Sequence, residues 1–572
     1  MRAAFASAIL VASALVGACD EAAPAGDGSA TPALPAPLSY PPGPYGVAEG
    51  ETLPDLAFEG VDAAGARATL RLASFHIGEA AAPRLLLIQV TGGLWCGTCR
   101  WTAEHLDAVI EEAAGGRVDR LDVVLRDRDN APPDADRDAA GWRHAVGGAR
   151  PTGVDPAFAL AGALEGVAAP LPLLLVVDER TMIVEAVLSN PDPHELAERL
   201  GHTLAELDGR PAPASEPESL VRDLFHENEW GMLVAMAEAP GAPPPDPTNE
   251  VADSAAAASL GAALFFDAGL SPSGTISCAT CHDPARGFSD DEPLAQGVAS
   301  SGRRTPSITL AAHGRWQNWD GSADSLWAQA LGPLENPIEM GSSRAFVAHR
   351  VLTAHGAAYR APFPDAAVRD VRGWPIAGKP GDAVYDALGA DEQRAITQVF
   401  VHAGKAIAAY ERALRVGPTP LDRYVAGDTS ALTDEELYGL VLYFRTGCAQ
   451  CHWGPRLTDD AFHDTGVGVA AGDAGRSRGV DRWRASEFRG DGPWSHAPIA
   501  RDVADAPEAT ARQFKTPSLR GVGASSFFGH AGGQHDLAGV TEAYGRPGER
   551  EPWLPTFTET AQWGLVPFLK TL

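Results

Sequence analysis

The chain has 572 residues, which is too many for one hydrophobic core, so three or four domains are expected. Asp and Glu number 75 against 45 Lys and Arg, giving a formal net charge of −30. This excess excludes the basic surface that nucleic acid or an anionic membrane would need. It could steer a basic partner protein, although a merely solvated acidic surface explains it equally well.

The N-terminus has the pattern of an export signal. Met1-Arg2 precedes an apolar stretch over 3–15, and the small residues 16–18 precede Cys19. This order predicts a signal peptide over 1–18 and resembles the lipobox of bacterial lipoproteins, in which Cys19 would become the lipidated first residue. The alternative is an ordinary signal peptide with an incidental cysteine.

No later segment has the roughly 18 uninterrupted apolar residues that a membrane span needs. We therefore expect an exported, periplasmic protein that a lipid anchor alone holds to the membrane. Residues 19–45 are rich in Ala, Pro and Gly, which is typical of a flexible tether.

Residues 46–208 alternate between strand and helix patterns, which predicts an α/β layer domain. Strands are expected at 85–90, 121–125, 173–177 and 183–188, and a helix at 103–113. The run Trp95-Cys96-Gly97-Thr98-Cys99 lies between the first strand and that helix.

The position of this Cys-x-x-Cys run favours redox chemistry. Free N–H groups at a helix start stabilise a thiolate, so Cys96 is the expected nucleophile and Cys99 the resolving thiol. The context resembles the thioredoxin family, and the resemblance implies that Pro172 is its cis-proline. That family often has Pro where Thr98 stands. The alternative is a structural disulfide, and a peroxiredoxin is a weaker match because no Cys lies in the expected Pro-rich loop.

Residues 209–250 are predicted to be a linker with one helix, placed where Leu220, Leu224 and Phe225 share a face. After residue 250 the patterns are mainly helical. Helical spacing runs from Ile396 to Tyr410, and Thr433-Asp-Glu-Glu436 predicts a capping box.

Two Cys-x-x-Cys-His runs follow, Cys278-Ala-Thr-Cys281-His282 and Cys448-Ala-Gln-Cys451-His452. This is the attachment pattern of c-type haem, in which two thiols bind the porphyrin and the histidine binds the iron. A zinc site or a structural disulfide is the alternative for either run. Two such runs predict two covalently bound haems, and haem of this type is attached outside the cytoplasm, which agrees with export.

The region from about residue 240 to 572 resembles the bacterial dihaem cytochrome c peroxidase/MauG family. The matching stretches are Leu260-Gly-Ala-Ala-Leu-Phe-Phe-Asp267, Ile276-Ser-Cys-Ala-Thr-Cys-His-Asp-Pro284, Trp319-Asp-Gly321, Gln329-Ala-Leu-Gly-Pro-Leu334, Asn336-Pro-Ile-Glu-Met340, Phe462-His-Asp-Thr-Gly-Val467, Phe514-Lys-Thr-Pro-Ser-Leu-Arg520 and His530-Ala-Gly-Gly533. The resemblance implies a mainly α module of two cytochrome c-like lobes, placed at 251–425 and 426–572.

The resemblance assigns the peroxide-binding haem to the first lobe, with His282 as its proximal ligand. Glu339 and Gln329 match the acid–base group and its polar partner, and Glu339 would move a proton between the peroxide oxygens. Trp319 matches the tryptophan that relays electrons between the haems. Without the family match, Glu339 would be taken for a helix cap or surface carboxylate, and Trp319 for a core residue.

His452 is the implied proximal ligand of the second haem. Family peroxidases place methionine opposite it, but this chain has no methionine after Met340, and Tyr544 stands at that position. MauG-type members carry tyrosine there, and a phenolate favours high iron oxidation states. The alternative is a packing tyrosine, with a histidine as ligand. The candidate histidines are His463, His496, His530 and His535.

Two further departures from the family pattern concern the resting state. No histidine lies between His282 and His313, so the first haem is expected to be five-coordinate. Arg304 stands where the family has an Asn that binds calcium, and a guanidinium cannot be a ligand. Its charge would replace that of the ion, with Ser525 and Phe527 at the other ligand positions. Calcium is therefore a doubtful cofactor.

These features predict an oxidoreductase that reduces hydrogen peroxide and oxidises an external donor or a protein substrate. One alternative is a detoxifying cytochrome c peroxidase that takes electrons from a soluble cytochrome or cupredoxin. The other is a thiol-disulfide oxidoreductase with an electron-carrying dihaem module.

Overall fold

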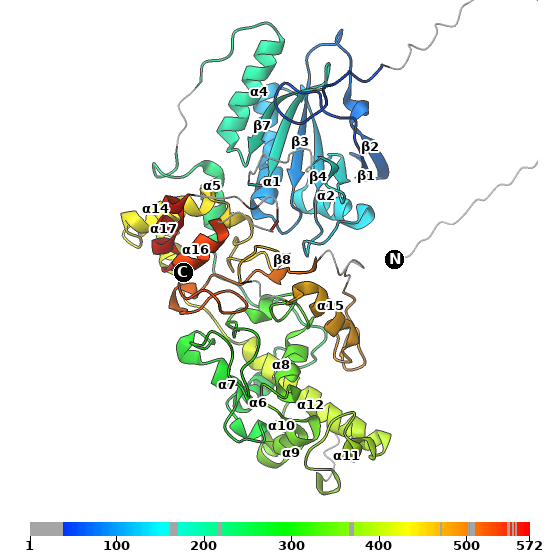
Figure 1. Ribbon diagram of the computed structural model, residues 1–572, viewed down its shortest axis with the longest axis vertical. Coiled ribbons are helices and arrows are strands. Elements are labelled where there is room, and N and C mark those ends of the chain that lie inside the picture. The colour runs from blue at the N-terminus through cyan, green and yellow to red at the C-terminus, as the bar shows by residue number, and fades with distance from the viewer. Residues whose placement is uncertain are drawn as a thin grey trace, which may run out of the picture. The chain divides into compact units, whose positions relative to one another are not determined.

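The computed structural model describes most of the chain after residue 37 (Figure 1). The described residues are 38–160, 170–215, 220–364, 371–468, 472–501, 503, 510–545, 550–551, 554 and 558–572. Residues 40–572 form one compact unit. The predicted signal peptide, most of the tether and Cys19 lie outside the described residues. Among the described residues, no helix is both long and apolar enough to cross a lipid bilayer.

The first domain is built on one seven-stranded sheet with the order β2-β1-β5-β4-β3-β6-β7. Its strands are β1 (Ala57–Val61), β2 (Arg67–Arg71), β3 (Leu85–Thr91), β4 (Val118–Val124), β5 (Thr152–Val154), β6 (Leu173–Asp178) and β7 (Ile183–Ser189). Strand β3 pairs in parallel with β4 and antiparallel with β6, which pairs antiparallel with β7. These four strands confirm the predicted ones, and their order is that of a thioredoxin-like fold.

Helices cover both faces of this sheet (Figure 1). Helices α1 (Gly97–Ala114) and α4 (Pro193–Leu207) pack on the face that Leu85 and Leu87 of β3 contribute to. Helix α2 (Ala140–Val146) packs on the other face, with Leu86 and Ile88. Burial on both faces explains why β3 is a continuous apolar run rather than an alternating one.

The helix predicted near Leu220 begins later. Residues 221–225 form a tight turn, in which Arg222 and Asp223 have φ of 54° and 59°, outside the helical region. Helix α5 (Glu227–Ala237) starts at a capping box, where the backbone N–H of His226 donates to the Glu229 carboxylate. Its apolar side chains pack in the core of the second lobe, so α5 is part of the module rather than a linker helix.

The first lobe is mainly helical, as expected. Its helices are α6 (Ala255–Phe265), α7 (Cys278–Cys281), α8 (Leu326–Glu335), α9 (Arg344–Ala354), α10 (Gly356–Arg360), α11 (Ala383–Asp386) and α12 (Ala390–Glu411). The face predicted from Ile396 to Tyr410 lies on α12, which packs against α6, α8 and α9. Gly261 of α6 faces the Ala406 carbonyl of α12 so closely that no side chain would fit there.

The second lobe contains α13 (Pro420–Val425), α14 (Asp434–Arg445), α15 (Gly475–Ala485), α16 (Leu537–Gly545) and α17 (Glu559–Leu569), with a ribbon of β8 (Phe462–His463) and β9 (Phe514–Lys515). The capping box of α14 is confirmed, since the Thr433 N–H donates to Glu436 over 2.7 Å. Leu421 and Tyr424 of α13 pack in this lobe's core, although the sequence analysis ended the first lobe at residue 425.

Candidate functional site

The first Cys-x-x-Cys-His run forms helix α7 and the residue after it. The His282 Nδ1 lies 3.0 Å from the Phe288 carbonyl oxygen. A carbonyl can only accept, so Nδ1 carries the proton and Nε2 keeps its lone pair for a metal. Burial lowers the pKa of His282, which also favours the neutral ring. The Cys278 side chain packs against the apolar core of the first lobe.

The second run repeats this arrangement. The His452 Nδ1 lies 3.1 Å from the Leu457 carbonyl oxygen, and the Tyr443 hydroxyl donates to the His452 carbonyl. Cys278, Cys281, Cys448 and Cys451 are all free thiols. Both runs therefore offer two thiols and an oriented imidazole nitrogen, which is the donor set that c-type haem requires. When bound, each haem supplies an iron that can change oxidation state.

Glu339 lies in the turn after α8, where Val298 N–H donates to its carbonyl over 2.8 Å. Burial raises the pKa of its carboxyl, while Asn336 and the charge of Arg482 act in the opposite direction. Gln329 lines a cavity of about 250 Å³ that Arg482 also lines, and its amide donates to Asn318. Arg482 thus lines the cavity beside Gln329 and also acts by its charge on Glu339.

Trp319 lies where the two lobes meet. Its indole N–H donates to the Arg304 carbonyl over 2.9 Å, and its own carbonyl accepts from Lys515 N–H of β9. The ring centroid is 6.4 Å from that of His530, which in turn stacks on Phe514 at 3.4 Å. The indole is therefore held between backbone of the first lobe and aromatic rings of the second.

Tyr544 is carried by α16 and is half-buried. Burial first, and then the neighbouring Cys451, raises the pKa of its hydroxyl, while a hydrogen bond with Thr465 lowers it. Cys448 contributes to the same shift, so Tyr544 lies near both thiols of the second run. This placement suits a ligand to the haem that those thiols would hold.

Of the four rival histidines, His463 shares the surroundings of Cys451. Both ring nitrogens of His463 are engaged, Nδ1 with Glu551 at 3.0 Å and Nε2 with Asp459 at 2.8 Å. His530 stacks on Phe514, His535 lies edge-on to Phe527, and His496 lines a cavity with Trp494. The ligand atoms of His463, Cys451 and Asp459 lie within 4.8 Å of one another and could hold a metal ion, but both nitrogens of His463 pair with carboxylates in this structure.

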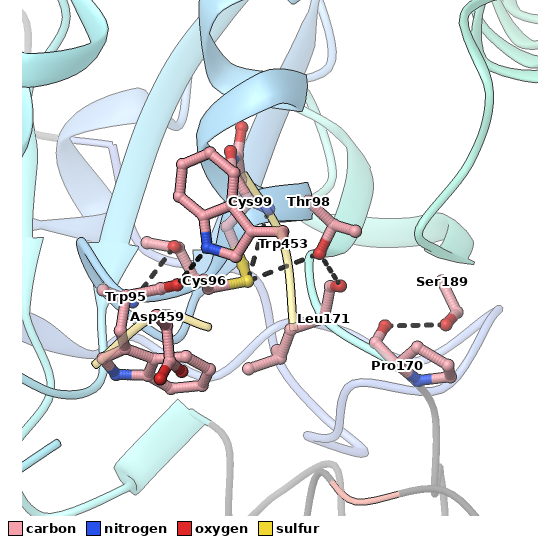
Figure 2. Close-up of a disulfide and its surroundings, with 12 residues drawn as sticks. Trp95, Cys96, Thr98, Cys99, Pro170, Leu171, Ser189, Trp453 and Asp459 are labelled. Carbon is pink, nitrogen blue, oxygen red and sulfur yellow. Dashed lines mark hydrogen bonds between the residues drawn. A yellow bond between two sulfur atoms is a disulfide. The ribbon is translucent and has the colours of Figure 1, made fainter. Parts of the chain in front are cut away.

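Cys96 and Cys99 form a disulfide at the start of α1 (Figure 2). Cys96 is the N-cap residue, and its sulfur accepts from Cys99 N–H over 3.3 Å. The Thr98 hydroxyl donates 2.8 Å to the Leu171 carbonyl, next to the cis peptide bond between Leu171 and Pro172. Both cysteines are 0% exposed.

The comparisons with known proteins agree with this geometry. The family model for di-haem cytochrome c peroxidase matches residues 255–430. A methylamine utilization protein MauG from Methylorubrum extorquens is 34% identical over 324 residues, which cover 55% of this chain and 77% of the relative. The chain belongs to the dihaem cytochrome c peroxidase/MauG family. It is therefore an oxidoreductase of the kind that acts on peroxide, with two c-type haems.

Two further proteins are similar to parts of the chain. A cytochrome c551 peroxidase from Pseudomonas aeruginosa is 32% identical over 212 residues, covering 36% of this chain and 53% of the relative. A putative protein disulfide isomerase from Bacteroides thetaiotaomicron is 20% identical in its solved structure, covering 28% of this chain and 91% of that one, with a TM-score of 0.21. The family model itself begins after the thioredoxin-like domain.

Arg304 is the residue that the sequence resemblance assigns to the position of a calcium ligand. Its guanidinium is buried and donates to Ser289 and Ser525 over 3.3 and 3.2 Å. Ser525 is one of the two positions to which the remaining calcium ligands were assigned from the sequence. The positively charged guanidinium of Arg304 therefore lies beside Ser525.

The contacts between the thioredoxin-like domain and the dihaem module were not predicted from the sequence. Trp453, the residue after the second run, donates from its indole to the Trp95 carbonyl over 2.9 Å. Asn130 donates to the Phe462 carbonyl over 2.8 Å, and Asp129 accepts from the Trp316 indole over 3.1 Å. No periodicity or motif marks these residues, because each bond joins segments that are at least 187 residues apart.

Proposed function

We propose that this chain is an exported, lipid-anchored peroxidase of the MauG type, which uses hydrogen peroxide to oxidise an external donor or a protein substrate. Membership of the family supports the reaction class. Tyr544, together with the lack of any methionine after Met340, carries the choice of the MauG type, and the influence of Cys451 and Cys448 on the pKa of its hydroxyl supports that choice. Export is supported by the N-terminal pattern and by the haem-attachment motifs.

Glu339 is the proposed acid–base residue. A carboxyl whose pKa is raised by burial can accept a proton near neutral pH and return it, so Glu339 would take a proton from one peroxide oxygen and deliver it to the other. Gln329 would orient the peroxide by hydrogen bonding. Oxidising equivalents would then pass through Trp319, whose indole is fixed by the Arg304 carbonyl.

A peroxidase that draws electrons from a small cytochrome or cupredoxin is the second candidate. The relative named cytochrome c551 peroxidase favours it. Against it stand Tyr544 and the absence of methionine after Met340, because a phenolate lowers the potential at which the second haem would accept electrons.

The test is the addition of hydrogen peroxide to the purified diferric protein without any donor, followed by optical and EPR spectroscopy. We expect both ferric signals to decline at once and a long-lived oxidised form to accumulate. A protein that reacts only after one electron has been supplied would contradict the proposal and would favour the second candidate.

A further inference from the structure

The catalytic face of the thioredoxin-like domain is covered by the second haem motif. Trp453 follows His452 directly, and its indole lies against the Cys96–Cys99 disulfide (Figure 2). A methyl group on Gly97 would lie 2.3 Å from Cγ of Trp453, so only glycine leaves room for this ring. The guanidinium of Arg100 also packs over this indole, with its carbon 5.1 Å from the ring centre of Trp453.

The cover is part of a continuous packed interface. Cys451 packs against the core of the thioredoxin-like domain, and Ala461 belongs to that core. Trp95 lies edge-on to His463, with centroids 4.7 Å apart. Asn130 donates to the carbonyl of Phe462, the residue directly before this histidine. The two motifs are thus held together by apolar contacts and buried hydrogen bonds.

Burial of the pair restricts its chemistry. Thiol–disulfide exchange requires an attacking thiolate to reach a sulfur atom. Cys96 and Cys99 are both 0% exposed, so a partner's thiol cannot reach them while Trp453 is in place. Electrons need no such access, because they can pass through an indole in van der Waals contact. Trp453 offers that route, since it is bonded to His452 and touches the thiol motif.

We propose that the Cys96/Cys99 dithiol is an internal two-electron donor to the second haem, connected to it through Trp453. This inference rests on the proposed peroxidase function. The two thiols lose two electrons and two protons as the sulfur–sulfur bond forms. Hydrogen peroxide gains two electrons and two protons as its oxygen–oxygen bond breaks, giving two waters. The haem module carries the electrons, and the protons exchange with solvent.

The experiment uses the full-length diferric protein after prolonged incubation with an excess of a small water-soluble phosphine, which reaches the buried disulfide when the interface opens transiently, and desalting under argon. One equivalent of hydrogen peroxide is added, samples are quenched in acid, and free thiols are alkylated and located by peptide mass spectrometry. The haem spectrum is followed in parallel. We expect Cys96 and Cys99 to lose their free thiols together as the peroxide-induced spectrum decays.

Three variants make the result specific. Glu339→Gln should lose its thiols about 10²–10⁴ times more slowly than wild type, because peroxide cleavage at the haem is slowed by that factor. Trp453→Phe should slow thiol loss several-fold and prolong the oxidised spectrum. Trp101→Phe is its matched control, since this indole packs on Gly231 of α5 whereas Trp453 packs on Gly97 of the disulfide motif, and thiol loss should proceed at the wild-type rate.

The possible failures are distinguishable. Thiols that persist while peroxide changes the haem spectrum would overturn the internal donor and leave the peroxidase function standing. Equal thiol loss in wild type and Glu339→Gln would also overturn it, because peroxide would then react with the thiols directly. If peroxide does not change the haem spectrum, even in a Cys96→Ser/Cys99→Ser protein, the peroxidase function itself would be refuted.

Discussion

The indole N–H of Trp453 donates a 2.9 Å hydrogen bond to the carbonyl of Trp95. One partner follows the second haem ligand and the other precedes the first redox cysteine, so a single bond joins the two motifs. The thioredoxin-like domain therefore forms part of the surroundings of the second haem. This arrangement argues against a domain that merely shares a chain with the peroxidase.

Gly97→Ala should expose the disulfide. The new methyl group would overlap Trp453, and relieving such overpacking costs about 1–3 kcal/mol, which displaces the closed arrangement. Reduction of the disulfide by a small dithiol should accelerate by about tenfold or more. Gly141→Ala is the control, because a methyl group there meets open space on α2. Unchanged reduction kinetics in Gly97→Ala would show that Trp453 does not limit access.

Tyr544→Met should convert the second haem to the ligation of the family's donor-dependent peroxidases. Exchanging a phenolate for a thioether should raise its reduction potential by on the order of 0.1 V and change its optical spectrum. Spectroelectrochemical titration measures both. Tyr438→Phe, an exposed tyrosine on α14, should alter neither. Identical titrations for Tyr544→Met and wild type would remove Tyr544 from the ligand set.

Glu339→Gln should lower the rate constant for the reaction with peroxide by about 10²–10⁴. The carboxylate must be deprotonated to accept the first proton. Because burial raises the pKa of Glu339, the wild-type rate should climb with pH through a pKa above the ordinary 4.5. Stopped-flow measurements across pH test this. Glu335→Gln removes a carboxylate that pairs with Arg344 at 3.1 Å, and its pH profile should match wild type.

Glu179→Gln should change the pH dependence of stability in the thioredoxin-like domain. Burial, followed by Asp119, raises the pKa of Glu179 to about 8. The folded state therefore holds this proton more tightly than the unfolded state, and the free energy of unfolding falls as pH rises from about 4.5 to about 8. At pH 8 the variant should be more stable by about 1–3 kcal/mol, with little difference near pH 5.

Calorimetry of the full chain at both pH values measures this effect. The exposed Glu111→Gln on α1 provides the control, since its unfolding should follow the wild-type pH dependence. A stability difference for Glu179→Gln that is the same at both pH values would contradict the assignment of the proton to this carboxyl.

Chelation of calcium should leave the wild-type haem spectra and thermal midpoint unchanged, because Arg304 supplies a fixed cation beside Ser525. Arg304→Ala removes the donors to Ser289 and Ser525 and should lower stability by about 1–3 kcal/mol. Arg286→Ala, at an exposed arginine, should have little effect. A wild-type protein that loses activity in a chelator and regains it with calcium would overturn this interpretation.

Local patterns predicted most of the fold. The strands β3, β4, β6 and β7 follow from short apolar runs, and the capping box of α14 follows from Thr433 and Glu436. Helix α5 was misplaced because the apolar spacing of residues 220–225 is overridden by left-handed backbone at Arg222 and Asp223. Strands β1 and β2 were missed because they are short, and β2 is largely exposed.

The candidate site also contains residues that the sequence predicts and residues that it does not. The haem-attachment residues are contiguous in the sequence, so spacing alone identifies them. The contact of Trp453 with Trp95 and that of Asn130 with Phe462 depend on which surfaces pack together. A polar residue in a loop and a tryptophan after a motif carry no signal of their partners, and such pairs become visible only once the chain has folded.

The packing of Cys451 against the thioredoxin-like core has a consequence for biogenesis. Thioether formation requires both thiols of a run to approach the porphyrin, whereas this thiol lies inside a domain interface in the finished protein. We therefore expect attachment at the second run to come before the two domains close on each other. A chain that closes first is expected to take up haem at the second run more slowly than one that is still open.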